Sequence, residues 1–315
     1  MLEHGGQLRA AARRWGNPLA DWLDLSTGIA PWPYPVPPPP AEIWQRLPEV
    51  EDGLEVAARD YYGVQNLLVL PGSQAAILAL PRLFAPGRVV LPTPIYNEHP
   101  AAWQACGHTL VSWREAADYA VLCNPNNPTG ARFTRDALLE RARGVRVLVV
   151  DEAFIDVAPD ESLAALAGTI PAENIVVLRS LGKFFGLAGA RVGCAIAAPK
   201  LLDQLAVVLG PWTIAHPARW AARHALADFA WQAAQRIRLV AASERLAHLL
   251  GCLGEPTGTA LFQHVATPRA AELHEQLARR AILVRHFTAP SALRFGLPGS
   301  ESEWQRLTDC LKEIA

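Results

Sequence analysis

A lysine stands in a glycine-rich loop whose neighbours suit a reactive amine. Lys183 follows the apolar run 175–178, and two phenylalanines come directly after it. A lysine among small and aromatic residues can be desolvated, which lowers the pKa of its amine and makes it a usable nucleophile. Ser180 lies three residues before the lysine and Arg191 lies eight residues after it. Both side chains suit an anionic group held close to the amine, although the pattern alone also fits a solvated surface lysine.

An acidic residue ends a buried strand upstream of this loop. Asp151 follows the run 147–150, Val-Leu-Val-Val, and consecutive apolar residues of this kind are typical of a strand in a parallel sheet. Ligands of open α/β sheets bind at the carboxyl ends of such strands. A carboxylate at that place can pair with a protonated pyridine nitrogen. Its plain structural alternative is the N-cap of a following helix.

Two further loops offer polar groups after predicted strands. The string Cys-Asn-Pro-Asn-Asn-Pro-Thr-Gly at 123–130 makes a sharp loop, and the Asn127 amide can donate a hydrogen bond to a phenolate oxygen. The run Gly72-Ser73-Gln74 lets a backbone approach a ligand and points helix N–H groups at it, as a phosphate site requires. Ordinary turns explain either loop in isolation. A Schiff-base lysine, a phosphate site and a partner for a pyridinium are what pyridoxal 5'-phosphate requires.

These strings resemble the fold type I pyridoxal-phosphate enzymes, the aspartate aminotransferase superfamily. The similarity is closest to the histidinol-phosphate aminotransferase branch and, within it, to the threonine-phosphate decarboxylases of cobalamin biosynthesis. His4-Gly5-Gly6 resembles the opening signature of the decarboxylases, and Phe154 stands where aminotransferases of this branch usually carry tyrosine. The resemblance implies decarboxylation of L-threonine O-3-phosphate to (R)-1-amino-2-propanol O-2-phosphate and CO2. The alternative is a histidinol-phosphate aminotransferase or a related class I/II aminotransferase.

The resemblance implies roles for the residues that would touch the cofactor. Lys183 would hold pyridoxal phosphate as a Schiff base, Asp151 would keep its ring nitrogen protonated, and Asn127 would bond its phenolic oxygen. The ring that stacks on the pyridine is His99 or Tyr96, and the register of the Tyr-x-Glu pattern favours His99. The phosphate would be bound by a set of residues from three loops, namely Gly72, Ser73, Gln74, Ser180 and Arg191.

The resemblance also implies how the substrate is bound. Arg294 would clamp the α-carboxylate, because an arginine fork matches a carboxylate with two hydrogen bonds. Arg285 and His4 are candidates for the substrate phosphate, with Gly5 and Asn127 beside them. A homodimer is implied as well. One departure is Leu47, which replaces the tyrosine that in many relatives reaches the neighbouring subunit's cofactor phosphate.

Composition excludes several other classes of function. The 315 residues carry a net charge of −1, without the clustered Lys and Arg that nucleic acid binding requires. No apolar run reaches the ~20 residues of a membrane helix, so we expect no membrane partner. The five cysteines form no Cys-x-x-Cys pair, which is typical of a reduced, cytoplasmic protein. We expect no bound metal.

The order of apolar runs predicts an α/β fold with a large, mostly parallel sheet. We expect an N-terminal segment over 1–40, a large cofactor-binding domain over 41–200, and a helical connection with a small C-terminal α+β domain over 201–315. Residues 41–62 and the stretch from 199 to about 253 read as helical. The predicted strands are 66–70, 88–91, 108–113, 119–122, 145–150, 175–178, 192–197, 259–265 and 293–295, and helices are predicted over 270–280 and 301–313.

Overall fold

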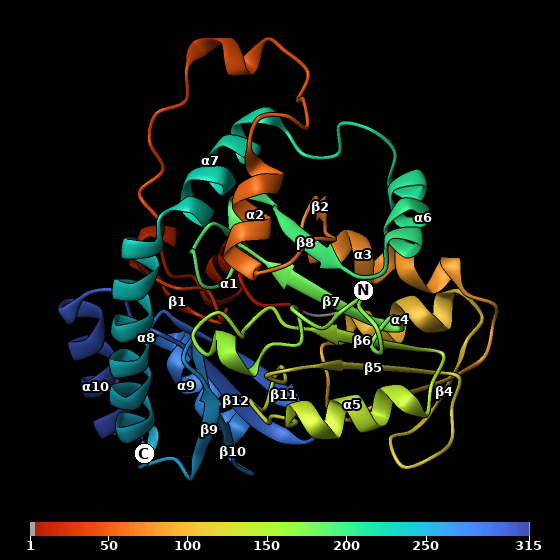
Figure 1. The fold of residues 1–315 in the computed structure, drawn as a ribbon. Helices are drawn as coiled ribbons and strands as arrows, with labels where there is room; N and C mark the ends of the chain where they lie inside the picture. The colour runs from red at the N-terminus through yellow and green to blue at the C-terminus, as the bar shows by residue number, and fades with distance from the viewer. Residues whose placement is uncertain (1–3, 315) are drawn as a thin grey trace. The chain divides into compact units, whose positions relative to one another are not determined.

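The computed structural model describes residues 4–314 of the chain (Figure 1). They divide into two compact units. Unit 1 contains residues 4–33, 128–131 and 235–314, and unit 2 contains residues 34–127 and 132–234. These bounds differ from the predicted domains, which assign 201–234 to the C-terminal part.

Residues 201–234 belong to unit 2 because their helices pack there. Helix α7 (His216–Ala227) lies against α2 (Leu54–Tyr62). Its Arg219 bonds two carboxylates, Asp52 at 2.7 Å and Glu55 at 2.7 Å. These ion pairs therefore hold α7 against α2 within unit 2.

Unit 2 is built on a seven-stranded sheet of order β2-β8-β7-β6-β5-β3-β4. The neighbouring strands from β4 to β7 pair in parallel, whereas β8 is antiparallel to both β7 and β2. The mostly parallel sheet expected from the sequence is thus confirmed. The strands are β2 (Leu68–Leu70), β3 (Arg88–Leu91), β4 (Thr109–Ser112), β5 (Tyr119–Cys123), β6 (Val147–Asp151), β7 (Ile175–Ser180) and β8 (Gly193–Ile196).

Helices flank the sheet of unit 2, as Figure 1 shows for α3 and α5. Strand β5 is buried along its whole length, as expected for a strand covered on both faces. The α-helices of this part are α2, α3 (Ser73–Ala79), α4 (Glu98–Ala105), α5 (Arg135–Arg143), α6 (Pro199–Leu209), α7 and the start of α8 (Phe229–Leu250). Short 3₁₀ turns are η2 (Ala41–Trp44), η3 (Leu80–Leu83), η4 (Pro159–Glu161) and η5 (Ala188–Ala190).

Unit 1 holds a five-stranded sheet of order β1-β11-β12-β10-β9. The edge strand β1 pairs in parallel with β11, and the other pairs are antiparallel. Helix α9 packs on β11 and β12. The elements are α1 (Leu8–Trp15), η1 (Leu19–Asp21), β1 (Leu23–Leu25), the rest of α8, β9 (Pro256–Thr259), β10 (Phe262–Ala266), α9 (Ala270–Arg279), β11 (Ile282–Thr288), β12 (Ser291–Gly296) and α10 (Glu301–Ile314).

None of the helices within residues 4–314 is long and apolar enough to cross a membrane.

Candidate active site

The carboxylate at the end of β6 is fixed on both of its oxygens. Asp151 is only 5 % exposed. Its Oδ1 accepts a hydrogen bond from the backbone N–H of Ala153 at 3.1 Å, and its Oδ2 lies 3.0 Å from His99 Nε2. A carboxylate held in this way has its direction set by the fold. Such a group can hold the proton of a heteroaromatic nitrogen.

His99 lies directly beside Asp151 in the structure. Its ring is 0 % exposed, and its Nε2 is the group that contacts the carboxylate. This contact makes His99 a neighbour of the predicted partner of the ring nitrogen. The stacking role that the Tyr-x-Glu register favours for His99 stays a prediction.

Tyr96 is the aromatic residue beside this pair that remains half-buried. Its ring packs edge-on against His99, with centroids 6.2 Å apart and planes at 81°. Its hydroxyl donates to Gln74 Oε1 at 3.3 Å, and Gln74 Nε2 donates to Glu98 Oε2 at 2.8 Å. Burial, aided by the charges of Glu98 and Asp151, raises the pKa of Tyr96 to about 12. The phenol therefore stays protonated at neutral pH, and Tyr96 remains the alternative candidate for the stacked ring.

The predicted phosphate residues converge around Gly193. This glycine pairs with Ser180 across β7 and β8, and a Cβ on it would lie 2.6 Å from the backbone nitrogen of Ser73. Gly72 has a φ of 78°, which favours glycine, and a Cβ there would lie 2.8 Å from Arg191 Nη2. Backbone N–H, hydroxyl and guanidinium groups thus gather in one place, as an anion site requires.

Lys183 is half-buried on the loop after β7. Its Nζ lies 5.7 Å from the centre of the Phe154 ring. The side chains on either side of it in the sequence, Leu181, Phe184 and Phe185, are fully buried. A short loop therefore holds the amine close to an aromatic ring.

The loop that carries Asn127 is braced by the side chains of its neighbours. The Asn124 amide makes two hydrogen bonds with the backbone of Phe133, at 3.2 Å and 2.9 Å. Asn126 Nδ2 donates to the carbonyl of Pro94 at 3.0 Å. The backbone N–H of Asn124 also bonds the carbonyl of Asp151 at 2.9 Å. Asn127 therefore starts from a fixed backbone next to the end of β6.

A buried charge network behind the site was missed by the sequence analysis. Arg179 on β7 bonds Asp156 at 2.6 Å and Glu152 at 3.2 Å, and all three side chains are buried. Tyr61 donates to Asp156 at 2.9 Å, and the guanidinium lies 4.6 Å from the Tyr62 ring centre. Burial raises the pKa of Glu152, against the opposing effect of Arg179. The sequence signal that could have revealed this network is Arg179, a charged residue near the end of an otherwise apolar strand.

The predicted substrate residues other than Asn127 lie in unit 1, and two of them, Gly5 and Arg294, converge on Ser26. The backbone N–H of Gly6 donates to Ser26 Oγ at 2.7 Å, and a Cβ on Gly5 would collide with the Ser26 carbonyl. Arg294 Nη2 donates to that carbonyl at 3.1 Å. Arg294 is 7 % exposed, and its guanidinium lies 5.0 Å from the Phe262 ring centre.

A cavity of about 450 Å³ in unit 1 brings together the two phosphate candidates. His4 and Arg285 both line it, with Arg14 and His286. Arg294 does not line this cavity, although Arg285 and Arg294 are directly paired across β11 and β12. Paired residues project on the same face of a sheet. The side chains of Arg285 and Arg294 therefore leave the backbone on the same face of the unit 1 sheet.

Comparison with known proteins places these residues in a family. The profile of the family described as "Aminotransferase class I and II" matches residues 47–311. The chain belongs to this family. A threonine-phosphate decarboxylase from Pseudomonas aeruginosa is 52% identical over 99% of this chain and 97% of that protein. Another from Sinorhizobium is 38% identical over 99% of this chain and 98% of that protein. A histidinol-phosphate aminotransferase from Aeromonas hydrophila is 34% identical over 69% of this chain and 66% of that protein.

Solved structures share the fold of this chain. A histidinol-phosphate aminotransferase from Sinorhizobium meliloti, solved with pyridoxal-5'-phosphate, has a TM-score of 0.83 at 20% identity. The match covers 100% of this chain and 96% of the chain of that aminotransferase. An L-threonine-O-3-phosphate decarboxylase from Porphyromonas gingivalis has a TM-score of 0.75 at 20% identity, covering 92% of this chain and 98% of its own. The predicted fold type I architecture is thereby confirmed.

The residues of unit 2 fit pyridoxal phosphate, group by group. The cradle of Gly72, Ser73, Ser180 and Arg191 has the donors that a phosphate needs, and Gly72 keeps it clear of a side chain. Asp151 is directed as a pyridinium partner. Lys183 supplies an amine, Asn127 supplies an amide, and His99 or Tyr96 supplies an aromatic ring. The arrangement suits a bound aromatic aldehyde phosphate.

Proposed function

We propose that this protein is a pyridoxal-phosphate-dependent decarboxylase that converts L-threonine O-3-phosphate to (R)-1-amino-2-propanol O-2-phosphate and CO2, a step of cobalamin biosynthesis. The observation that carries the proposal is the 52% identity to a threonine-phosphate decarboxylase over 99% of this chain. The similarity to a histidinol-phosphate aminotransferase, at 34% identity over 69% of the chain, is lower and shorter.

The residues of unit 2 have separable roles in this reaction. Bound pyridoxal phosphate supplies an electron-accepting ring for the electron pair left when the carboxylate departs as CO2. Asp151 keeps a proton on the ring nitrogen, and His99 holds the direction of that carboxylate. Lys183 would hold the cofactor through its Nζ, and the same amine would be available to return a proton to the α-carbon of the substrate.

The residues of unit 1 anchor the substrate at its two anionic ends. Arg294 binds the α-carboxylate through its fork, from a position already oriented by Ser26 and Phe262. Arg285 and His4, which share one cavity, bind the phosphate. Two anchors fix the orientation of the substrate, and orientation decides which bond at the α-carbon breaks.

Incubation with L-threonine O-3-phosphate separates this function from transamination. The decarboxylase releases CO2 over many turnovers without an oxo acid, because its cofactor is regenerated as the aldehyde. An aminotransferase instead transfers the amino group of its substrate once and then stops. Its amino-group transfer resumes when 2-oxoglutarate is added. Repeated CO2 release without 2-oxoglutarate supports the proposal, and a single turnover rescued by 2-oxoglutarate refutes it.

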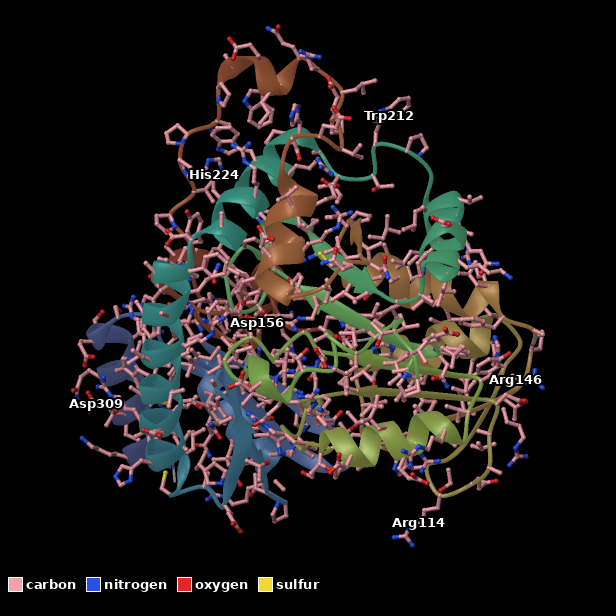
Figure 2. The ribbon with its side chains drawn as sticks, viewed as in Figure 1. Arg114, Arg146, Asp156, Trp212, His224 and Asp309 are labelled. Carbon is pink, nitrogen blue, oxygen red and sulfur yellow. The ribbon has the colours of Figure 1, made fainter. Side chains whose placement is uncertain are left out.

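We infer that the protein is a homodimer and that unit 2 supplies the interface. Trp212 projects from the loop between α6 and α7 (Figure 2), and it lines a surface hollow together with Val50. Both are largely exposed, as is Leu47 at the position where many relatives carry a tyrosine that reaches the neighbour. Exposed apolar groups of this kind mark interfaces. Light scattering should give twice the chain mass of 34.2 kDa, and a monomer at micromolar concentration would refute the inference.

A cytoplasmic location is proposed from the cysteines. All five are free in the structure, which fits a reducing compartment. Fractionation of cells that express the protein should recover it with cytoplasmic markers.

A further inference from the structure

Cys123 is a buried residue at the candidate active site that the proposed reaction does not use. It is the last residue of β5 and pairs directly with Asp151 at the end of β6. Its Sγ, the His99 imidazole and an Asp151 carboxylate oxygen offer three ligand atoms that all lie within 4.8 Å of one another. All three residues are buried. A thiol, an imidazole and a carboxylate therefore lie close together beside the sheet.

The three side chains form a ligand set that Zn²⁺ accepts. Thiolate, imidazole and carboxylate are its usual protein ligands, and three of them with one water make a tetrahedral site. Tetrahedral zinc holds nitrogen and oxygen ligands about 3.4 Å apart, and His99 Nε2 and Asp151 Oδ2 already lie 3.0 Å apart. A thiolate sulfur in such a site lies about 3.5 Å from the nitrogen. The sulfur of Cys123 lies within 4.8 Å of both of the other ligand atoms.

The sulfur of Cys123 is also within reach of two backbone donors. Backbone groups of Tyr96 and Asn127 hydrogen-bond the sulfur. A divalent ion that binds a thiol displaces its proton, and the two donors then stabilise the sulfur as a ligand.

We propose that the cofactor-free protein binds one Zn²⁺ ion through His99, Cys123 and Asp151. Binding forms a Zn–S bond and releases the thiol proton to solvent, with no change of oxidation state. On the proposed function, Asp151 is also the partner of the cofactor ring, so metal and pyridoxal phosphate exclude each other. Zinc is then an inhibitor of cofactor loading that a chelator reverses.

Cobalt(II) is the probe for the metal site itself. Full-length protein stripped of cofactor and treated with EDTA is titrated with Co²⁺. One equivalent should give a thiolate-to-cobalt absorption band in the near ultraviolet, and Zn²⁺ should abolish it by displacement. Absence of the band, or its growth beyond one equivalent without saturation, would overturn the proposal.

Three variants tie the band to these residues. Cys123→Ser accepts the same two backbone hydrogen bonds and should lose the band, because the band needs a thiolate bound to cobalt. His99→Gln should weaken cobalt binding while it still donates to Asp151. Cys252→Ser removes an exposed thiol and should leave the band unchanged. An unchanged band in Cys123→Ser, or its loss in Cys252→Ser, places the metal elsewhere.

Competition is measured separately, so that the metal site and the proposed function can fail independently. Zn²⁺ added before pyridoxal phosphate should block the cofactor absorption band, EDTA should restore it, and Cys123→Ser should load cofactor in the presence of Zn²⁺. If cobalt binds but pyridoxal phosphate never does, the metal site stands and the proposed function falls. Simultaneous binding of both overturns the exclusion. If Cys123→Ser misfolds, Cys123→Ala takes its place.

Discussion

Arg179 and Asp156 form a buried ion pair with 2.6 Å between Nη2 and Oδ1. The pair joins β7, which leads to Lys183, to the loop after β6, which carries Phe154. Glu152 bonds the same guanidinium from the residue next to Asp151. The segments that carry the amine and the ring-nitrogen partner are therefore fastened to each other by one side chain.

Removing that side chain should be strongly destabilising. Arg179→Met leaves two buried carboxylates without their counter-charge, and such losses cost about 3–5 kcal/mol. Urea unfolding followed by fluorescence measures the change. Arg143→Met, which breaks the exposed pair with Glu140, is the matched control and should change stability by less than about 1 kcal/mol. Equal effects of the two variants would contradict the role of Arg179.

Substitution of His99 should act through Asp151. His99→Leu removes the hydrogen bond to the carboxylate and should lower kcat/KM about tenfold or more, the effect of losing one hydrogen bond to a charged group. His99→Gln retains a donor and should recover much of that loss. Steady-state kinetics at saturating pyridoxal phosphate measures both. A Gln variant as impaired as the Leu variant would argue against this orienting role.

Lys183 should carry the cofactor covalently. The purified protein should be yellow, and borohydride reduction should fix the cofactor on the peptide that contains Lys183. Lys183→Ala should lower kcat by about 10²–10⁴-fold, since proton transfer by a positioned group contributes that much. Mass spectrometry of the reduced protein decides the site, and a label on Lys200 instead would reject the assignment.

The two arginines of unit 1 should be separable by substrate. Arg294→Lys keeps its charge and loses the fork, so it should raise KM markedly for L-threonine O-3-phosphate and for unphosphorylated L-threonine alike. Arg285→Gln should impair only the phosphorylated substrate. Kinetics with both compounds provide the comparison. If Arg285→Gln impaired the use of both substrates equally, Arg285 would not be the residue that binds the substrate phosphate.

Stability at alkaline pH should reveal the buried phenol of Tyr96. The folded state raises its pKa from 10.0 to about 12, so the protonated form is favoured on folding. The stabilisation is fully present below pH 10 and is lost as the pH rises from 10 to about 12. The wild-type protein should therefore lose stability relative to Tyr96→Phe over that range in urea titrations. A constant difference between the two proteins would mean that Tyr96 titrates normally.

The sequence predicted the sheet of unit 2 well because long apolar runs mark buried parallel strands. It failed where polar residues interrupt the pattern. Strand β11 contains Arg285 and His286 and was not predicted, and β1 is only three residues long. Residues 41–62 read as one helix, but η2 ends at Trp44 and α2 begins at Leu54, after Pro48 and a Gly53 with φ of 89°.

The positions of Lys183, Asp151 and Arg191 in loops at strand ends could be predicted, because they follow from the order of strands. Their roles stay predictions. The contact between His99 and Asp151 was not predicted, because it depends on which side of α4 meets the sheet. Spacing along the chain does not contain that information.

The docking of Gly5 and Gly6 on Ser26 has a practical consequence for handling the protein. His4, which directly precedes these glycines, lines the cavity with Arg285. A purification tag joined shortly before His4 would therefore lie close to the substrate-binding candidates. Kinetic constants measured on such a fusion describe an enzyme with an added peptide at its substrate site. A cleavable tag, or one attached after residue 315, avoids that alteration.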